Sequence, residues 1–187
     1  MYGLGDFCTD IKTALTTQDG DAARETIRTQ LEELLKNQGF ISANCHEDAE
    51  VGAHVLYQDD ELGFMVLNHV NDEGRKSPPH DHGESWAIYG QAVGHTDMSE
   101  FDRLDDEAED GKAEVKKVNE YRLTPGLAGM FGPRQIHAIN FIDGSRFIRV
   151  TGTDLAQIAT RKFDMAEGTV TEVPPTTGSL GAGGDSA

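Results

Sequence analysis

The pattern of apolar and polar positions changes near residue 51, and the two parts of the chain predict different secondary structure. Within residues 21–37, apolar side chains recur at about the 3.6-residue period of an amphipathic helix. Asp19 or Asp21 can cap the start of this helix, and Gly39 is expected to end it. Residues 7–15 predict a shorter helix, and we expect both helices to pack on the outside of the following domain. The apolar stripe of the longer helix consists of Ala22, Ile27, Leu31, Leu34 and Leu35.

From about residue 51 the apolar positions take the period of two that is typical of half-buried strands. Turn sequences separate these segments, for example Asn-Asp-Glu-Gly at 71–74 and Thr-Pro-Gly at 124–126. Many short strands with turns between them predict an all-β fold, a sandwich or barrel of the jelly-roll kind. The expected strands cover residues 53–57, 64–70, 85–94, 98–104, 114–123, 136–142 and 146–151.

The same pattern predicts a single folded domain. A chain of 187 residues is long enough for one hydrophobic core. We expect residues 1–50 to form a helical segment packed on a barrel at residues 51–173. Residues 174–187 are mainly Pro, Thr, Gly, Ser and Ala. Such a segment has too few apolar residues to fold, so we expect a disordered tail.

The composition excludes several classes of partner. A net charge of −17 argues against nonspecific binding of nucleic acid and of anionic lipid surfaces, because both require basic residues. No segment approaches the roughly 20 apolar residues of a membrane span, and the N-terminus lacks the pattern of a secretory signal. The two cysteines, Cys8 and Cys45, form no disulfide framework. These observations predict a cytoplasmic protein.

Candidate chemistry concentrates in residues 78–86, Pro-Pro-His-Asp-His-Gly-Glu-Ser-Trp. If this stretch is extended, His80 and His82 share one face and Asp81 points the other way. A third histidine, His137, follows a Gly-Pro turn and opens another apolar run. Three neutral imidazoles from two strands form a site for a first-row transition metal, with coordination positions left for a substrate or dioxygen.

These motifs resemble those of the cupin superfamily. Residues 79–82, Pro-His-Asp-His, with the aromatic strand at 86–90, look like the first cupin metal motif. Residues 132–140, Gly-Pro-Arg-Gln-Ile-His-Ala-Ile-Asn, are similar to the second. Within the superfamily the chain most resembles the thiol dioxygenases, the cysteine dioxygenase-like proteins, from about residue 52 to 154. The resemblance implies a cupin double-stranded β-helix and a mononuclear Fe(II) held by His80, His82 and His137, with oxygen chemistry at sulfur.

The substrate-binding positions of that family are not retained. Its carboxylate-binding arginine would fall near His54, and its cross-linked cysteine would fall near Ala87. Its Ser-x-His-x-Tyr triad would fall at Phe147, Arg149 and Thr151. The resemblance therefore implies the scaffold and the metal centre, but not a cysteine-specific enzyme.

Three further residues are candidates for the pocket. Arg149 lies on an otherwise apolar strand and can bind an anionic substrate, because a guanidinium pairs bidentately with a carboxylate. The alternative is an exposed arginine paired with an acidic neighbour. With unbroken alternation, Glu84 and Trp86 share the face of His80 and His82. Glu84 is then a catalytic base, a metal ligand, a partner of an imidazole or a rim carboxylate in solvent. Trp86 contacts the substrate or packs in the core.

The favoured function is oxidation of a small anionic thiol, or a related small acid, by dioxygen at Fe(II). Three neutral ligands leave the ion its full positive charge, which favours an anionic donor such as a thiolate. Two alternatives stay open. The same ligands suit Zn, Ni or Mn in a hydrolase, lyase or isomerase with Glu84 as base. The barrel also suits a nonenzymatic sensor or binding module. The sequence permits a monomer or a homodimer.

Overall fold

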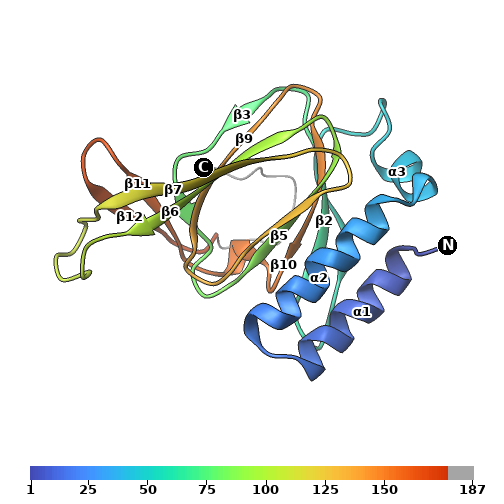
Figure 1. Ribbon diagram of the computed structural model, residues 1–187, viewed down its shortest axis with the longest axis horizontal. Coiled ribbons are helices and arrows are strands. Elements are labelled where there is room, and N and C mark those ends of the chain that lie inside the picture. Colours follow the sequence, from blue (N-terminus) through green and yellow to red (C-terminus); the bar gives the residue numbers. More distant parts are fainter. Residues whose placement is uncertain (177–187) are drawn as a thin grey trace.

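Three helices open the chain in the structure, a computed structural model that describes residues 1–176 (Figure 1). They are α1 (Leu4–Thr17), α2 (Gly20–Leu35) and α3 (Gln38–Asn44). The prediction that Gly39 ends α2 is wrong: α2 ends at Leu35, and Gly39 lies within α3. The Asn37 side chain accepts hydrogen bonds from the N–H groups of Gly39 and Phe40, and so caps a new helix.

The strands form two antiparallel sheets, which confirms the predicted all-β jelly-roll fold with N-terminal helices. The first sheet has the order β1-β2-β10-β5-β8. The second has the order β12-β11-β4-β9-β6-β7, and β3 pairs with β9. The bounds are β1 (Gly52–Gln58), β2 (Met65–Val70), β3 (Arg75–Lys76), β4 (His80–Asp81), β5 (Ala87–Val93), β6 (Thr96–Arg103), β7 (Val115–Leu123), β8 (Ala128–Phe131), β9 (Ile136–Phe141), β10 (Arg146–Thr151), β11 (Thr160–Asp164) and β12 (Thr169–Val173).

The strands absent from the sequence prediction are short or polar. β3 and β4 have two residues each, and β8 has four. β11 and β12 form a hairpin of largely polar residues that pairs with β4. The short 3-10 helix Leu155–Gln157 precedes this hairpin. Part of the tail that was expected to be disordered is placed, because the N–H of Thr176 donates to the Ala156 carbonyl at 2.8 Å. Residues 177–187 lie outside the described residues.

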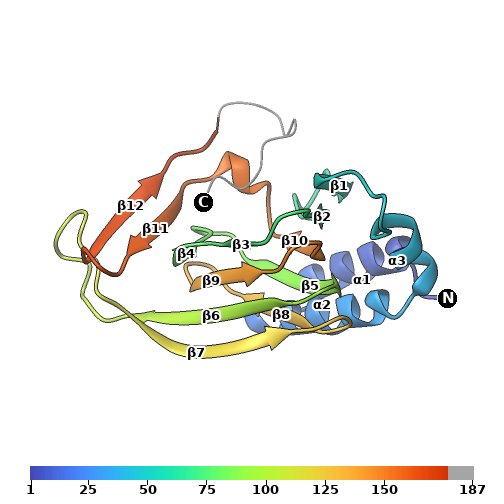
Figure 2. The ribbon, with the colours of Figure 1, turned by 90° about the horizontal axis from the view of Figure 1, so that it is seen from above.

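The helices cover the outer face of the first sheet. Figure 2 shows α1 and α2 side by side against the strands. Leu31 of α2 packs in one apolar cluster with Ile88 of β5 and Ile148 of β10. Gly90 permits this close approach, since a Cβ there would lie 2.7 Å from a methyl group of Leu31. None of these helices, within the described residues, is long and apolar enough to cross a membrane.

β10 places the polar side chains of the interior. Ile148 and Val150 point outward into the apolar cluster under the helices. Because side chains alternate along a strand, Phe147, Arg149 and Thr151 point the other way, into a cavity between the two sheets. All six residues of β10 are buried, as are all six of β2. The first sheet is therefore covered on both faces at its centre.

An ion pair fastens α1 to the turn between β1 and β2. Lys12 Nζ lies 2.6 Å from Oδ2 of Asp59, whose side chain is buried. Asp59 also accepts hydrogen bonds from the Tyr57 hydroxyl at 2.9 Å and from the N–H of Leu62 at 2.8 Å. These contacts, led by the bond from Lys12 and then by that from Leu62, hold the pKa of Asp59 below its ordinary value.

We predict that Asp59→Asn lowers the free energy of unfolding at pH 7, and that this loss shrinks as the pH falls. Since the pKa of Asp59 is lower in the folded chain, its stabilising contribution is present above the unfolded pKa of about 3.9. It is lost as the pH falls toward the folded value. Urea unfolding at pH 7, 5 and 3 measures the difference. Asp60→Asn, at the exposed neighbouring residue, is the control and should show little loss at any pH. Equal losses for the two variants would contradict the assignment.

Candidate metal centre

Three histidines from two adjacent strands meet at one end of the cavity. His80 lies on β4 and pairs in register with His137 on β9. His82 follows β4, and the three side chains offer ligand atoms within 4.8 Å of one another. The ring centroids are 4.5 to 5.3 Å apart. The structure thus brings together the two histidines that strand alternation placed on one face and the third histidine, which follows the Gly-Pro turn at residues 132–133.

Backbone carbonyl groups orient two of these rings. His137 Nδ1 lies 3.1 Å from the carbonyl oxygen of Gln135, and His80 Nδ1 lies 3.0 Å from that of Pro78. A carbonyl oxygen only accepts, so Nδ1 carries the proton in both rings. Nε2 is then the atom with a lone pair for a metal ion. Phe131 stacks on His137 with ring centroids 3.9 Å apart and further fixes that ring.

Burial favours the neutral form of two of the imidazoles, those of His82 and His137. His82 is 6% exposed and His137 is fully buried. Loss of hydration lowers the pKa of both well below the ordinary histidine value, and the neighbouring histidines and Arg149 act in the same direction. Among the described residues, His82 Nδ1 and His137 Nε2 have no hydrogen-bond partner. Buried polar atoms without partners are costly, so these nitrogens fit a bound metal ion.

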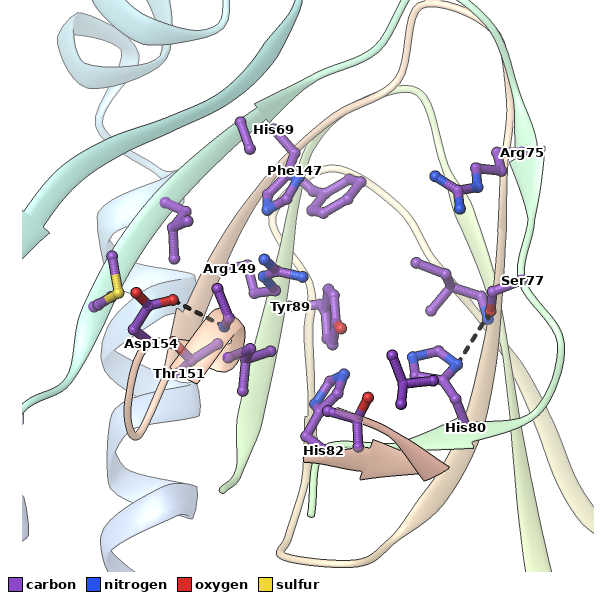
Figure 3. Close-up of a pocket in the computed structure, with 18 of the residues that line it drawn as sticks. His69, Arg75, Ser77, His80, His82, Tyr89, Phe147, Arg149, Thr151 and Asp154 are labelled. Atoms are coloured by element: carbon purple, nitrogen blue, oxygen red, sulfur yellow. Dashed lines mark hydrogen bonds between the residues drawn. The ribbon is translucent and has the colours of Figure 1, made fainter. Parts of the chain in front are cut away.

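The cavity extends away from the histidines between the two sheets and has a volume of about 540 Å³. Figure 3 shows Arg149 directed into it from β10, near Tyr89 and above His82. The Arg149 side chain is 7% exposed, so the alternative of a surface arginine does not hold. His69 of β2 stacks on Phe147 with centroids 4.7 Å apart, and both line the cavity.

Sequence reasoning missed several cavity residues. His69 was recoverable in part, because it follows the alternation of the β2 strand and faces Phe147 across the pairing with β10. Arg75 had no such signal, since it follows a turn and lies on the two-residue strand β3. Lys162 lies on β11, a strand that polar composition concealed, and pairs in register with His80.

The expectation that Glu84 faces the histidines is wrong. Its side chain is 79% exposed and pairs with Arg134 at 2.7 Å, outside the cavity lining. The reason is a turn directly after His82. Gly83 has a φ of +54°, and the N–H of Ser85 donates to the His82 carbonyl at 3.0 Å. The extended backbone on which the alternation depended is interrupted there.

The same turn rules out the alternative in which Trp86 contacts the substrate and agrees with the one in which it packs in the core. When the strand resumes as β5, its phase has shifted by one residue: Ala87 and Tyr89 point inward. Trp86 instead packs with the apolar cluster under the helices and is not part of the cavity lining. It lies against Gly152, where a Cβ would come within 2.5 Å of the indole nitrogen. Trp86 is therefore a core residue.

Comparisons with known proteins give structural matches only. No protein-family model and no curated protein matches the chain. Among solved structures, KdgF from Halomonas sp. is 19% identical with a TM-score of 0.37, over 53% of this chain and 74% of that one. A cupin superfamily protein from Desulfitobacterium hafniense is 16% identical with a TM-score of 0.38, over 58% and 83%. Oxalate oxidase with the substrate analogue glycolate is 15% identical with a TM-score of 0.38, over 58% and 53%. This chain thus spans about half of that oxalate oxidase chain, and these low values support no conclusion about function.

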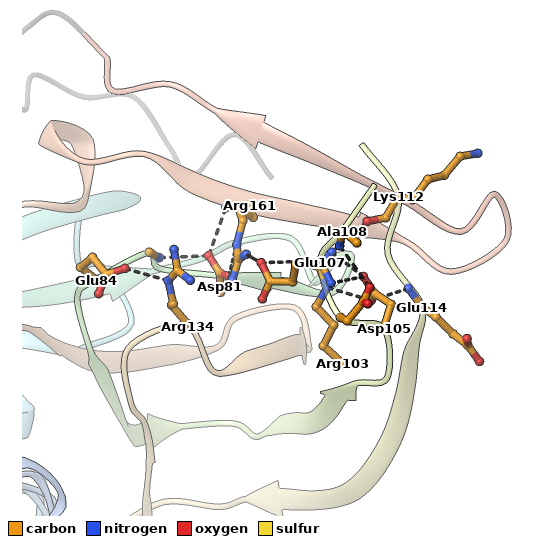
Figure 4. Close-up of polar contacts among 12 residues, drawn as sticks. Asp81, Glu84, Arg103, Asp105, Glu107, Ala108, Lys112, Glu114, Arg134 and Arg161 are labelled. Carbon is orange, nitrogen blue, oxygen red and sulfur yellow. Dashed lines mark hydrogen bonds and ion pairs between the residues drawn. The ribbon is translucent and has the colours of Figure 1, made fainter. Parts of the chain in front are cut away.

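Asp81, between the two ligand histidines of β4, forms a buried ion pair on the side away from them. The side chain of Asp81 is fully buried, and its Oδ2 accepts from Arg161 Nε at 2.7 Å. Its Oδ1 accepts from the N–H of Gly83 at 3.0 Å. Figure 4 shows the network continuing from Arg161 to Glu107 and then to Arg103. Part of the acidic loop between β6 and β7 is thereby tied to the strand that carries the histidines.

We predict that Arg161→Met lowers the free energy of unfolding by about 3 kcal/mol, because it leaves Asp81 buried without its ionic partner. It should also weaken metal binding about tenfold or more, since the strand that carries His80 and His82 loses its fixed position. Chemical unfolding and competition with a coloured chelator measure the two effects.

Arg134→Met is the matched control for this prediction. It removes the exposed pair with Glu84 next to the same turn, and exposed pairs contribute at most about 1 kcal/mol. A similar loss of stability in the two variants, or an unchanged metal affinity in Arg161→Met, would contradict the role given to Asp81 and Arg161.

Proposed function

We propose that this chain is a metal-dependent cupin enzyme, and specifically a mononuclear Fe(II) dioxygenase that oxidises a small anionic thiol. One observation carries the proposal: three histidines have converging ligand atoms, and two of them, His80 and His82, line the same cavity as the buried Arg149. His80, His82 and His137 would hold the metal. We further propose that the partners are a small-molecule substrate and dioxygen, and that the protein is a cytoplasmic monomer or homodimer.

A metal bound by these three histidines would supply activation of dioxygen and of a thiolate donor, since three neutral ligands would leave its positive charge uncancelled. The other tasks fall to the chain. Arg149 binds the anionic group of the substrate and thereby orients its reacting end toward the histidines. Met65, Leu67, Ile139 and Phe147 line the cavity with apolar surface, which excludes water and strengthens the charge interactions inside it.

The position of Glu84 weighs against the main alternative. A zinc, nickel or manganese hydrolase or lyase needs a base within reach of the metal, and Glu84 was the residue expected to supply it. Its carboxylate is exposed and paired with Arg134. Among the described residues, the carboxylates that do line the cavity are engaged as well, because Asp81 pairs with Arg161 and Asp154 accepts from the N–H of Ala156 at 2.9 Å.

We predict oxygen consumption when the protein is reconstituted anaerobically with Fe(II) and then given 3-mercaptopropionate and air-saturated buffer. An oxygen electrode and the iron content measure the outcome. Cysteamine, a thiol of similar size without a carboxylate, should show a kcat/KM lower by about tenfold or more, because it forms no pair with Arg149. His80→Ala should lose both bound iron and oxygen uptake.

His46→Ala, which changes an exposed histidine, is the matched control and should behave like the unaltered protein. Oxygen uptake no greater than that of His80→Ala with any thiol tested would refute the thiol dioxygenase. Tight zinc binding with hydrolytic activity would favour the other metalloenzyme, and ligand binding that survives loss of the histidines would favour a binding module.

A further inference from the structure

A buried hydroxyl group on the wall of the cavity has no hydrogen-bond partner. Thr151 is 1% exposed, and within the described residues its Oγ1 neither donates nor accepts a hydrogen bond. Thr151 lines the cavity from the end of β10, on the same face of the strand as Arg149 (Figure 3). A hydroxyl group that is buried without a partner costs free energy, so its presence at this position calls for an explanation.

The neighbouring side chains do not supply the missing partner. Thr151 lies opposite Met65 of β2 and Ala87 of β5, and directly opposed residues point to the same face of a sheet. Alanine has no polar side-chain atom, and the methionine sulfur is only a weak acceptor. Asp154 also lines the cavity, but its Oδ1 accepts from the N–H of Ala156, and no hydrogen bond joins it to Thr151. Within the described residues, the Thr151 hydroxyl group therefore makes no hydrogen bond that stabilises the fold.

Thr96 shows how a buried threonine stabilises this fold. It is 2% exposed on β6, its Oγ1 donates to Oε1 of Gln91 at 2.8 Å, and it is not part of the cavity lining. Thr151 differs in both respects, because its hydroxyl group has no such bond and borders the cavity. A position of this kind is typical of a group that binds a ligand, since the ligand then supplies the partner.

The spacing between Thr151 and Arg149 limits the structure of such a ligand. Residues two apart on a strand are separated by roughly 6.6 Å, so one small molecule can contact both side chains. In the proposed function Arg149 binds the carboxylate of a thiol acid, and the group that Thr151 binds then lies close to that carboxylate. A threonine hydroxyl both donates and accepts, which matches an alcohol group.

We propose that the substrate is a small thiol acid with an alcohol group on the carbon next to its carboxylate, and that Thr151 binds this alcohol. Thr151 is then a specificity-determining residue that favours 2-hydroxy thiol acids over thiol acids without the hydroxyl group. The inference deepens the proposed function and rests on it for the thiol and the carboxylate. Thr151 adds a third point of recognition to these two.

The test is anaerobic calorimetric titration of the purified protein with 3-mercaptolactate and with 3-mercaptopropionate, which differ only in the hydroxyl group. We expect 3-mercaptolactate to bind about fivefold more tightly, which is the effect of one neutral hydrogen bond. Thr151→Val replaces the hydroxyl by a methyl group, so it should remove this preference without lowering the midpoint of thermal unfolding. Thr151→Ser keeps the hydroxyl group and should keep the preference.

Thr96→Val is the matched control, because it removes a buried hydroxyl group that has a partner and lies outside the cavity lining. It should lower the midpoint of thermal unfolding and leave the preference unchanged. Equal affinities for the two thiols in the unaltered protein, or a preference that persists in Thr151→Val, would overturn the proposal. A loss of stability in Thr151→Val as large as that in Thr96→Val would also overturn it, because the hydroxyl group would then stabilise the fold through a buried water molecule.

Oxygen uptake in air separates this proposal from the proposed function. Binding of both thiols with the expected preference, but without oxygen uptake, would contradict only the dioxygenase. Binding of neither thiol would overturn both proposals.

Discussion

The position of β10 between β2 and β5 is the constraint on which the rest of the structure depends. Because the helices bury its outer face and the second sheet covers its inner face, alternate residues enter two different environments. Ile148 and Val150 contribute to the core under α2, whereas Phe147 and Arg149 reach the cavity. A shift of one residue in this pairing would place the arginine against the helices. The core that stabilises the fold thereby also fixes the cation of the site.

A second constraint, the pairing of β4, fixes the position of the metal centre. β4 is too short to be stable alone and is held between β9 and β11. On one side of it, His80 pairs with His137; on the other, Asp81 binds Arg161. The two residues of β4 therefore have different roles: His80 faces the cavity, and Asp81 faces the C-terminal hairpin. The network of ion pairs from Arg161 connects this strand to the loop between β6 and β7.

The sequence predicted the parts of the site that obey a simple period. His80 and His82 lie on extended backbone, so alternation placed them on one face. For Arg149 the sequence left the pocket and an exposed ion pair open, and its burial decides for the interior. Glu84 and Trp86 follow Gly83, whose positive φ breaks that period, and both assignments made across it were wrong. A glycine directly after the second histidine was the available warning. Other cavity residues depended on long-range pairing: nothing local indicates that β11 joins β4, or that the strand with Arg75 joins β9.

The positions of the nearby carboxylates determine the net charge around the three histidines. Asp81 adjoins two of the histidines in sequence, yet its charge is balanced by Arg161, and Glu84 is paired with Arg134 outside the cavity. A divalent ion bound by three neutral imidazoles would thus keep most of its charge, in a cavity that the buried Arg149 also lines. In a low-dielectric interior that charge requires compensation, and an anionic ligand is the group that can provide it. Under the proposed function, an anionic substrate would be favoured because the described carboxylates next to the histidines are committed to Arg161 and Arg134.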